Sequence, residues 1–147
     1  MNKLLKEVST KLFDYLGLEE IEIRYEEIPD DSRFYNHELY IGINNKYLNN
    51  ESETLKCLIH EIRHYYQLCV VAYQIELEAQ YEEWKKEFKL DQTKLKPEES
   101  MCLYIEVDAY AFTKYILNKW FNIDYHHYDK SYDQLLDKFI KCYYMRL

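Results

Sequence analysis

Glycine and proline are scarce in this chain, with only two residues of each among 147. An all-β fold needs many tight turns, and glycine and proline are prominent among the residues that form them. The scarcity argues against an all-β fold and favours a mainly helical chain with a little sheet. Hydrophobic residues make up 48% of the sequence, enough for a core, and the length suggests a single domain over residues 1–147.

Two segments in the first half of the chain have the apolar spacing of helices. Residues 3–16 predict a first helix, which Gly17 ends. Asn50 and Glu53 form a capping signature, so a second helix is expected to begin there and to run through residue 66 at least. The helical pattern then continues, with or without a break, to about residue 88.

The second half of the chain is also predicted to be helical. Pro97 suits the first turn of a helix that reaches about residue 121. Residues 122–130 are expected to connect this helix to a last one, which Ser131 and Gln134 open.

The small sheet is expected between residues 20 and 43, directly before the second helix. Residues 20–28 alternate between apolar and charged side chains, which is typical of a half-buried strand. Residues 29–32 predict a turn, and residues 38–43 predict a second strand. We expect this second strand to be an edge to which an extended peptide could add. The pattern as a whole predicts an α+β fold, mostly helical with a small β-sheet.

The formal net charge of −8 bears on which partners the chain can bind. An acidic surface repels phosphate backbones, so non-specific binding of nucleic acid is disfavoured. Such a surface ordinarily keeps a protein soluble. The alternative is that it attracts a basic protein partner.

The cysteines and the apolar segments indicate a cytoplasmic chain. Four cysteines lie far apart without a Cys-x-x-Cys pair, so we expect reduced, mostly buried thiols at Cys57, Cys69, Cys102 and Cys142. The first residues become charged too early for a signal-peptide core. No apolar run is long enough to span a bilayer, so no membrane association is expected.

The motif that carries chemistry is His60-Glu61-Ile62-Arg63-His64. Histidines four residues apart on a helix project from the same side, so their nitrogens can take two corners of a zinc tetrahedron. Zinc lowers the pKa of a bound water from about 16 to near 7, and Glu61 can then act as the general base. The competing interpretation is a surface helix with two spare histidines and a solvated glutamate.

Catalytic zinc usually has three protein ligands and a water, so the motif leaves one ligand to find. A metzincin has a histidine six residues after the motif, and Val70 at that position excludes this class. His126 and His127 could serve, although they lie in a predicted loop.

Glu106 is the better candidate for the third ligand. It lies in a strongly helical, apolar segment, and a buried carboxylate is costly unless it is paired or bound to metal. Asp108, two residues later, faces roughly the other way. It is expected to face solvent, to accept a hydrogen bond or to orient a ligating histidine. We favour Glu106, with Asp108 and the two late histidines as alternatives.

The two motifs together resemble a known family. His60-Glu61-x-x-His64 followed by Glu106-x-Asp108-Ala109-x-x-Phe112 is similar to the ImmA/IrrE family of zinc metallopeptidases, and more broadly to the gluzincins. The resemblance covers roughly residues 38–117.

This resemblance implies a small zincin-like domain with one Zn²⁺. By this likeness His60, His64 and Glu106 are the metal ligands and Glu61 is the catalytic base. The sequence departs from the family pattern at Thr113, where the family has an alanine.

The function that we expect is hydrolysis of a peptide bond in a protein or peptide substrate. The alternative is a non-catalytic binding or inhibitor protein on a zincin scaffold, of a mobile-element or anti-defence type. Such a protein would use its acidic, tyrosine-rich surface, and pairing of the strand at residues 38–43 on both sides would favour it.

The residue that would stabilise the transition state cannot be chosen from the sequence. Arg63 is expected at the surface or in an ion pair, and Gln67 is expected either to orient a loop or to be solvated. Several tyrosines and histidines could donate a hydrogen bond to an oxyanion. These candidates are Tyr65, Tyr66, Tyr125, His126, His127 and Tyr128.

Overall fold

The computed structural model describes residues 2–145, of which helices account for 59%, and it contains a small three-stranded sheet. The predicted α+β class is therefore confirmed. The chain divides into two units, Met1–Tyr66 and Gln67–Leu147, and the boundary falls inside the long helix α2 (Glu51–Ala72). The prediction of a single domain stays a prediction.

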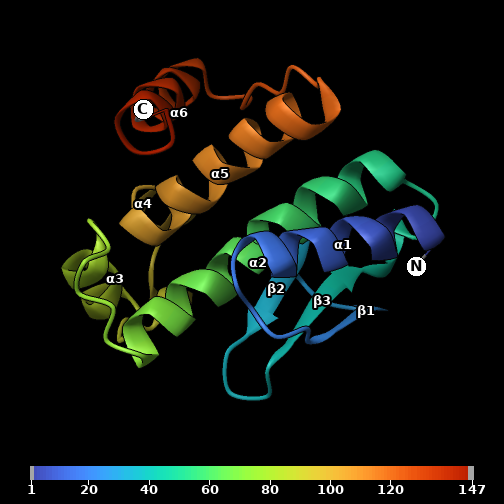
Figure 1. The fold of residues 1–147 in the computed structure, drawn as a ribbon, viewed down its shortest axis with the longest axis horizontal. Helices are drawn as coiled ribbons and strands as arrows, with labels where there is room; N and C mark the ends of the chain where they lie inside the picture. Colours follow the sequence, from blue (N-terminus) through green and yellow to red (C-terminus); the bar gives the residue numbers. More distant parts are fainter. Residues whose placement is uncertain (1, 146–147) are drawn as a thin grey trace. The chain divides into compact units, whose positions relative to one another are not determined.

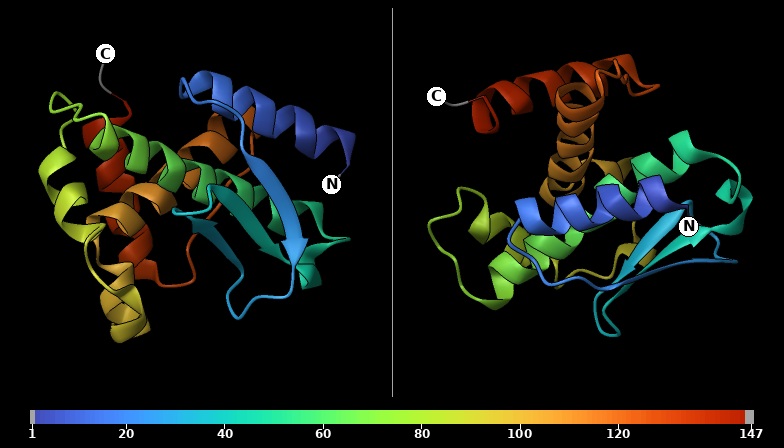
Figure 2. Two further views of the ribbon diagram at one scale, coloured as in Figure 1. Left: turned by 90° about the horizontal axis from the view of Figure 1, so that it is seen from below. Right: turned by 45° about the vertical axis from the view of Figure 1, so that its right-hand side comes forward.

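The sheet belongs to the first unit and has the strand order β1-β3-β2 (Figure 2). Strand β1 is Glu22–Glu26, β2 is Ser32–Tyr35 and β3 is Tyr40–Asn44. Strand β3 pairs in parallel with β1 and antiparallel with β2, so it is the central strand. Our prediction that residues 38–43 form an edge is wrong, because the short strand β2, which the sequence did not predict, covers the second side.

Helices cover one face of this sheet (Figure 1). Ile41 and Ile43 of β3 are fully buried on that face. The ring of Tyr65 in α2 contacts Phe34 of β2 and also Phe13 of helix α1 (Lys3–Tyr15). The packing of these rings and branched side chains holds α2 against α1 and the sheet.

The helix ends of the first unit follow the sequence signals. The Asn2 side chain accepts a hydrogen bond from the backbone N–H of Leu5 and caps α1. Gly17 ends α1 with a φ of 69°, a left-handed conformation that glycine adopts without strain. The Asn50 side chain accepts from the backbone N–H of Glu53 at 3.1 Å, so the predicted cap of α2 is confirmed.

The second unit contains more and shorter helices than predicted. Helix α2 ends at Ala72, and α3 (Tyr81–Glu87) follows after an irregular stretch. The helix expected over residues 97–121 is split into α4 (Pro97–Met101), which begins with the predicted proline, and α5 (Tyr104–Phe121). Helix α6 (Lys130–Tyr143) is capped by the Asp129 side chain and not by Ser131 as expected.

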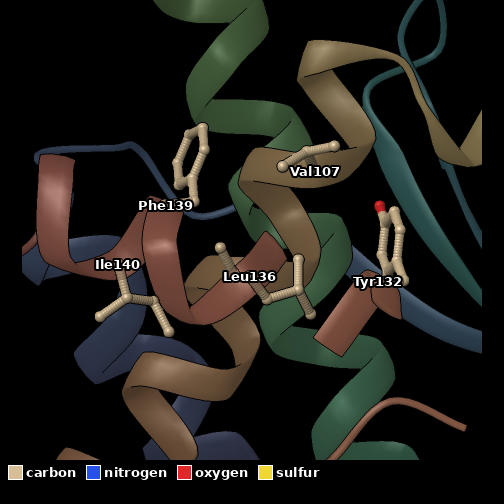
Figure 3. Packing of buried hydrophobic residues seen from close by; sticks show 6 residues of the cluster. Val107, Tyr132, Leu136, Phe139 and Ile140 are labelled. Atoms are coloured by element: carbon tan, nitrogen blue, oxygen red, sulfur yellow. The ribbon is translucent and has the colours of Figure 1, made fainter. Parts of the chain in front are cut away.

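Helices α5 and α6 enclose an apolar cluster in the second unit (Figure 3). Side chains from one stripe of α6 meet the flank of α5 in an arrangement typical of amphipathic helices. The cluster consists of Val107, Ala111, Tyr132, Leu136, Phe139 and Ile140.

The membrane and cysteine predictions have separate outcomes. Within residues 2–145, no helix has the combination of length and apolar character that crossing a bilayer requires. All four cysteines are free thiols, as expected. They are not mostly buried, however, because Cys102 and Cys142 are exposed and Cys69 is half-buried, which leaves Cys57 in the core.

Candidate metal centre

His60 and His64 converge on α2. Their Nε2 atoms lie 3.1 Å apart, and the two rings are nearly perpendicular, with an interplanar angle of 81°. This proximity follows from the four-residue spacing, which places both side chains on one helix face. His64 is buried and His60 is half-buried, so the histidine pair is partly shielded from solvent.

The distance between the two nitrogens tests whether this pair fits a zinc ion. A tetrahedral zinc with nitrogen ligands at about 2.0–2.1 Å separates those nitrogens by about 3.4 Å. The observed 3.1 Å is close to that separation. Both histidines also present the same ring nitrogen, so the donor atoms suit two corners of one tetrahedron.

Glu61, which lies between the two histidines in the sequence, is buried, with 5% of its surface exposed. Its Oε2 accepts a hydrogen bond from the hydroxyl of Ser32 at 2.7 Å. Ser32 opens strand β2, so the sheet holds the carboxylate through one oxygen. Within the described residues Oε1 makes no hydrogen bond, and this oxygen is free to accept a proton.

The groups around Glu61 are set by the same strand. The Arg33 guanidinium pairs with Asp30, and this hydrogen bond is the main cause that raises the pKa of Arg33, with a smaller contribution from the Glu61 charge. Burial raises the pKa of the Cys57 thiol to about 12 although Ser32 hydrogen-bonds to it. The Glu61 carboxylate is therefore flanked by one cation and one neutral thiol.

Glu106 lies in the second unit, in the first turn of α5, where it is half-buried. An acidic residue at this position interacts favourably with the positive end of the helix dipole. The start of α5 is itself held by Glu87 of α3, whose carboxylate accepts hydrogen bonds from the backbone N–H groups of Tyr104 and Ile105, both at 2.8 Å. The role of Glu106 as third metal ligand stays a prediction.

Asp108 and Gln67 form a buried polar pair in the second unit. The Gln67 amide donates to Oδ2 of Asp108 at 2.7 Å and to the Ile105 carbonyl at 3.0 Å. Asp108 also accepts a hydrogen bond from the Tyr144 hydroxyl. Both residues are fully buried, so neither is solvated. Of the alternatives for Asp108, acceptance of a hydrogen bond is the one observed. Their hydrogen bonds fix the side of α5 on which Asp108 lies.

The two late histidines have opposite environments. His126 is exposed, and its ring nitrogens contact Asp133 at 2.9 Å and Asp124 at 3.1 Å. These two carboxylates raise the pKa of His126. His127 is buried, and burial lowers its pKa. Both nitrogens of His126 are committed to carboxylates, so His126 is a poor metal ligand.

The structure also describes the surroundings of Arg63 and of two tyrosines considered as hydrogen-bond donors to an oxyanion. The Tyr65 hydroxyl donates to the Glu19 carbonyl at 3.0 Å, which leaves it little freedom to bind a substrate. Tyr128 is 88% exposed, and its hydroxyl points to the sulfur of Met101. Arg63 is buried, and its guanidinium lies 4.4 Å from the centre of the Tyr66 ring. Of its two expected environments, the surface position is wrong and the ion pair stays a prediction.

Comparison with family models, with curated proteins and with solved structures finds no match to this chain. The resemblance carried by the two motifs is therefore left as a prediction. What the site does must be argued from its own residues.

Proposed function

We propose that the chain is a zinc-dependent metallohydrolase that cleaves a peptide bond in a protein or peptide substrate. The convergence of the His60 and His64 Nε2 atoms beside a buried glutamate with one free oxygen is the observation that supports this function best. A surface helix with spare histidines would not need its glutamate buried and oriented. We place the enzyme in the cytoplasm, where free thiols are kept reduced.

The metal would be held by His60, His64 and Glu106. Two imidazoles and one carboxylate are a donor group that could hold a metal ion, and catalytic zinc sites commonly use three such ligands. A bound zinc ion would polarise the scissile carbonyl and lower the pKa of a water molecule.

The proton transfers would be carried out by Glu61. Its free Oε1 accepts the proton of the attacking water and then delivers it to the leaving amine. The Ser32 hydroxyl holds Oε2, so the carboxylate keeps one orientation through both transfers. Strand β2 thus positions the base, while helix α2 carries the base and two of the ligands.

Metal analysis of the purified protein tests the proposal most directly. We expect one zinc per chain after dialysis, and less than a tenth of that in the His60→Ala and His64→Ala variants. Glu106→Gln should weaken zinc binding, while Glu61→Gln should retain the zinc. Parent protein that takes up no zinc at micromolar concentration would refute a zinc enzyme.

A non-catalytic binding protein on the same scaffold is the second candidate. The pairing of β3 on both sides favours it, because the strand that we expected to receive a peptide is not an edge. The outer edges of β1 and β2 remain for an extended peptide. A screen of fluorogenic peptides with the zinc-loaded protein separates the two, since cleavage that is lost in Glu61→Gln is possible only for the enzyme.

A further inference from the structure

The outer face of the sheet, opposite α1, carries a layer of tyrosine and arginine side chains. Tyr40 of β3 and Tyr35 of β2 are cross-strand partners, and their rings are stacked with centroids 4.4 Å apart and an interplanar angle of 12°. The Arg24 guanidinium of β1 lies 3.7 Å from the centre of the Tyr40 ring. Because Ile41 is buried beneath the helices, the alternation of β3 places Tyr40 on the outer face. The stacked layer therefore spans all three strands.

Gly42 forms the floor on which a carboxylate lies in this layer. The Tyr40 hydroxyl donates to Oε1 of Glu26 at 3.1 Å, and a Cβ at position 42 would overlap that same oxygen. The same Cβ would lie 3.2 Å from the Tyr35 ring. Desolvation and the hydrogen bond to Glu26 raise the pKa of Tyr40 to about 12, so its hydroxyl stays protonated. The lack of a side chain at Gly42 thus lets the Glu26 carboxylate lie against the backbone of β3.

Glu26 has no counterion among residues 2–145, although arginines lie on the same face. Arg24 pairs with Glu22 at 3.1 Å, and Arg33 pairs with Asp30. Glu26 itself is half-buried, and both of its oxygens are contacted by a neutral tyrosine hydroxyl. A carboxylate that is partly removed from water is costly unless a cation compensates for the lost hydration. The site is therefore complementary to a positively charged group from outside the chain.

The composition of this face suits a protein as the source of that group. Tyrosine and arginine are enriched among the interface residues that carry most of the binding energy. Stacked rings are also held rigidly, so little side-chain freedom is lost when a partner binds. The net charge of −8 attracts a basic partner and repels phosphate backbones.

We propose that the outer face of the sheet binds a basic protein partner, and that the Glu26 carboxylate pairs with a lysine or arginine side chain of that partner. The stacked rings of Tyr35 and Tyr40 border this pair and keep water from it, as surrounding residues do at an interface hot spot. Ser32, which holds Glu61, is paired with Ile43 and lies on the opposite face. Binding on the outer face is therefore independent of the proposed hydrolysis.

The test uses the full-length protein and the peptide acetyl-Lys-Ser-Lys-Ser-Lys-amide as the probe. Amide shifts in ¹H–¹⁵N spectra at about 150 mM salt, where distant charges are screened, should change mainly in residues 22–26 and 40–44. Glu26→Gln should weaken the affinity roughly fivefold to tenfold, between the effect of an exposed ion pair and that of a hydrogen bond to a charged group. Glu27→Gln is the matched control, because it removes the same charge from an exposed position one residue later and should bind as the parent does.

A second variant moves the carboxylate without removing its charge. Gly42→Ala should displace the flexible end of Glu26 while the chain stays folded, and it should weaken probe binding as Glu26→Gln does. Equal affinity in the parent and in Glu26→Gln would overturn the proposal. Equal losses in Glu26→Gln and Glu27→Gln would also overturn it, because they would indicate general attraction to an acidic chain. Shifts confined to other surfaces, or tighter binding of acetyl-Glu-Ser-Glu-Ser-Glu-amide, would do the same.

Discussion

The two oxygens of Glu61 are in different situations, and this difference predicts the effects of two substitutions. Oε2 is held by Ser32, and Oε1 is the oxygen that would move the proton. Glu61→Gln should preserve the fold and bound zinc but lower turnover about 10²–10⁴-fold, because the amide cannot accept the proton. Ser32→Ala should lower turnover less, roughly tenfold, because it removes one hydrogen bond that orients the carboxylate and leaves the carboxylate itself in place. Peptide hydrolysis with parallel zinc analysis measures both.

The comparison of Glu61→Gln with Ser32→Ala separates loss of the proton acceptor from loss of its orientation. A Glu61→Gln variant as active as the parent would refute the catalytic base. Equal losses in both variants with lost zinc would instead indicate that the sheet supports the metal ligands.

Part of the candidate site could be predicted from the sequence because it is local. His60, Glu61 and His64 lie within one turn of α2, so helical periodicity alone brings the two imidazoles together. Ser32 could not be found in this way, because it reaches Glu61 across 29 residues. Its position after two aspartates indicated a turn. The environment of His127 was equally hidden, since it depends on how α6 packs on α5.

At the scale of elements, the start of α5 depends on a side chain from another helix. The Glu87 carboxylate occupies the place of an N-cap and accepts from two backbone N–H groups. Glu87→Ala should therefore lower the free energy of unfolding by about 1–2 kcal/mol, the usual cost of a lost cap. Urea unfolding measures this loss, and amide exchange at Tyr104 and Ile105 should accelerate.

A conservative variant gives the control for the α5 cap. Glu87→Gln keeps one acceptor oxygen and should lose less stability than the alanine variant. Unchanged amide exchange in Glu87→Ala would show that α5 begins without this carboxylate.

The elements that the sequence failed to predict have physical causes. Strand β2 is only four residues long, which is too short to show a clear alternation of apolar and polar side chains. Its pairing with β3 stabilises it instead. The break between α2 and α3 includes Gln74, which adopts a φ of 54° although it is not glycine. The cap of α6 is Asp129 and not Ser131, and because aspartate and serine cap helices about equally well, the sequence alone does not choose between them.

At the scale of the whole molecule, the free energy of unfolding should decrease as the pH falls. Burial acts to raise the pKa of Asp133, but hydrogen bonds from Lys114, the His127 backbone and His126 outweigh it and lower the pKa to about 2. A pKa below the unfolded value of about 3.9 gives stability that is complete above pH 4 and is lost as the pH falls toward 2. Urea unfolding of the parent between pH 5 and pH 2 should show this loss, and Asp133→Asn should show a smaller one.

Zinc removal is the second prediction for the whole molecule. Metal binding is coupled to folding, so bound zinc should stabilise the chain. At a free zinc concentration of about 100 Kd the stabilisation should be about 2.7 kcal/mol, and EDTA should remove it. Calorimetric scans with zinc and with EDTA measure the effect. A melting temperature that does not respond to either would contradict the proposed site.

The burial of Cys57 makes this thiol a reporter of motion between strand β2 and helix α2. Its side chain hydrogen-bonds with Ser32, and burial raises its pKa to about 12, so it stays protonated and unreactive in the folded chain. With the three more accessible cysteines replaced by serine, a disulfide reagent such as dithionitrobenzoate could modify Cys57 only when β2 separates from α2. As the reagent concentration rises, the modification rate should reach a plateau. The plateau equals the rate at which β2 separates from α2. Ser32→Ala should raise this plateau rate. The Ser32 hydroxyl would then be shown to hold strand β2 against helix α2 as well as to orient the Glu61 carboxylate.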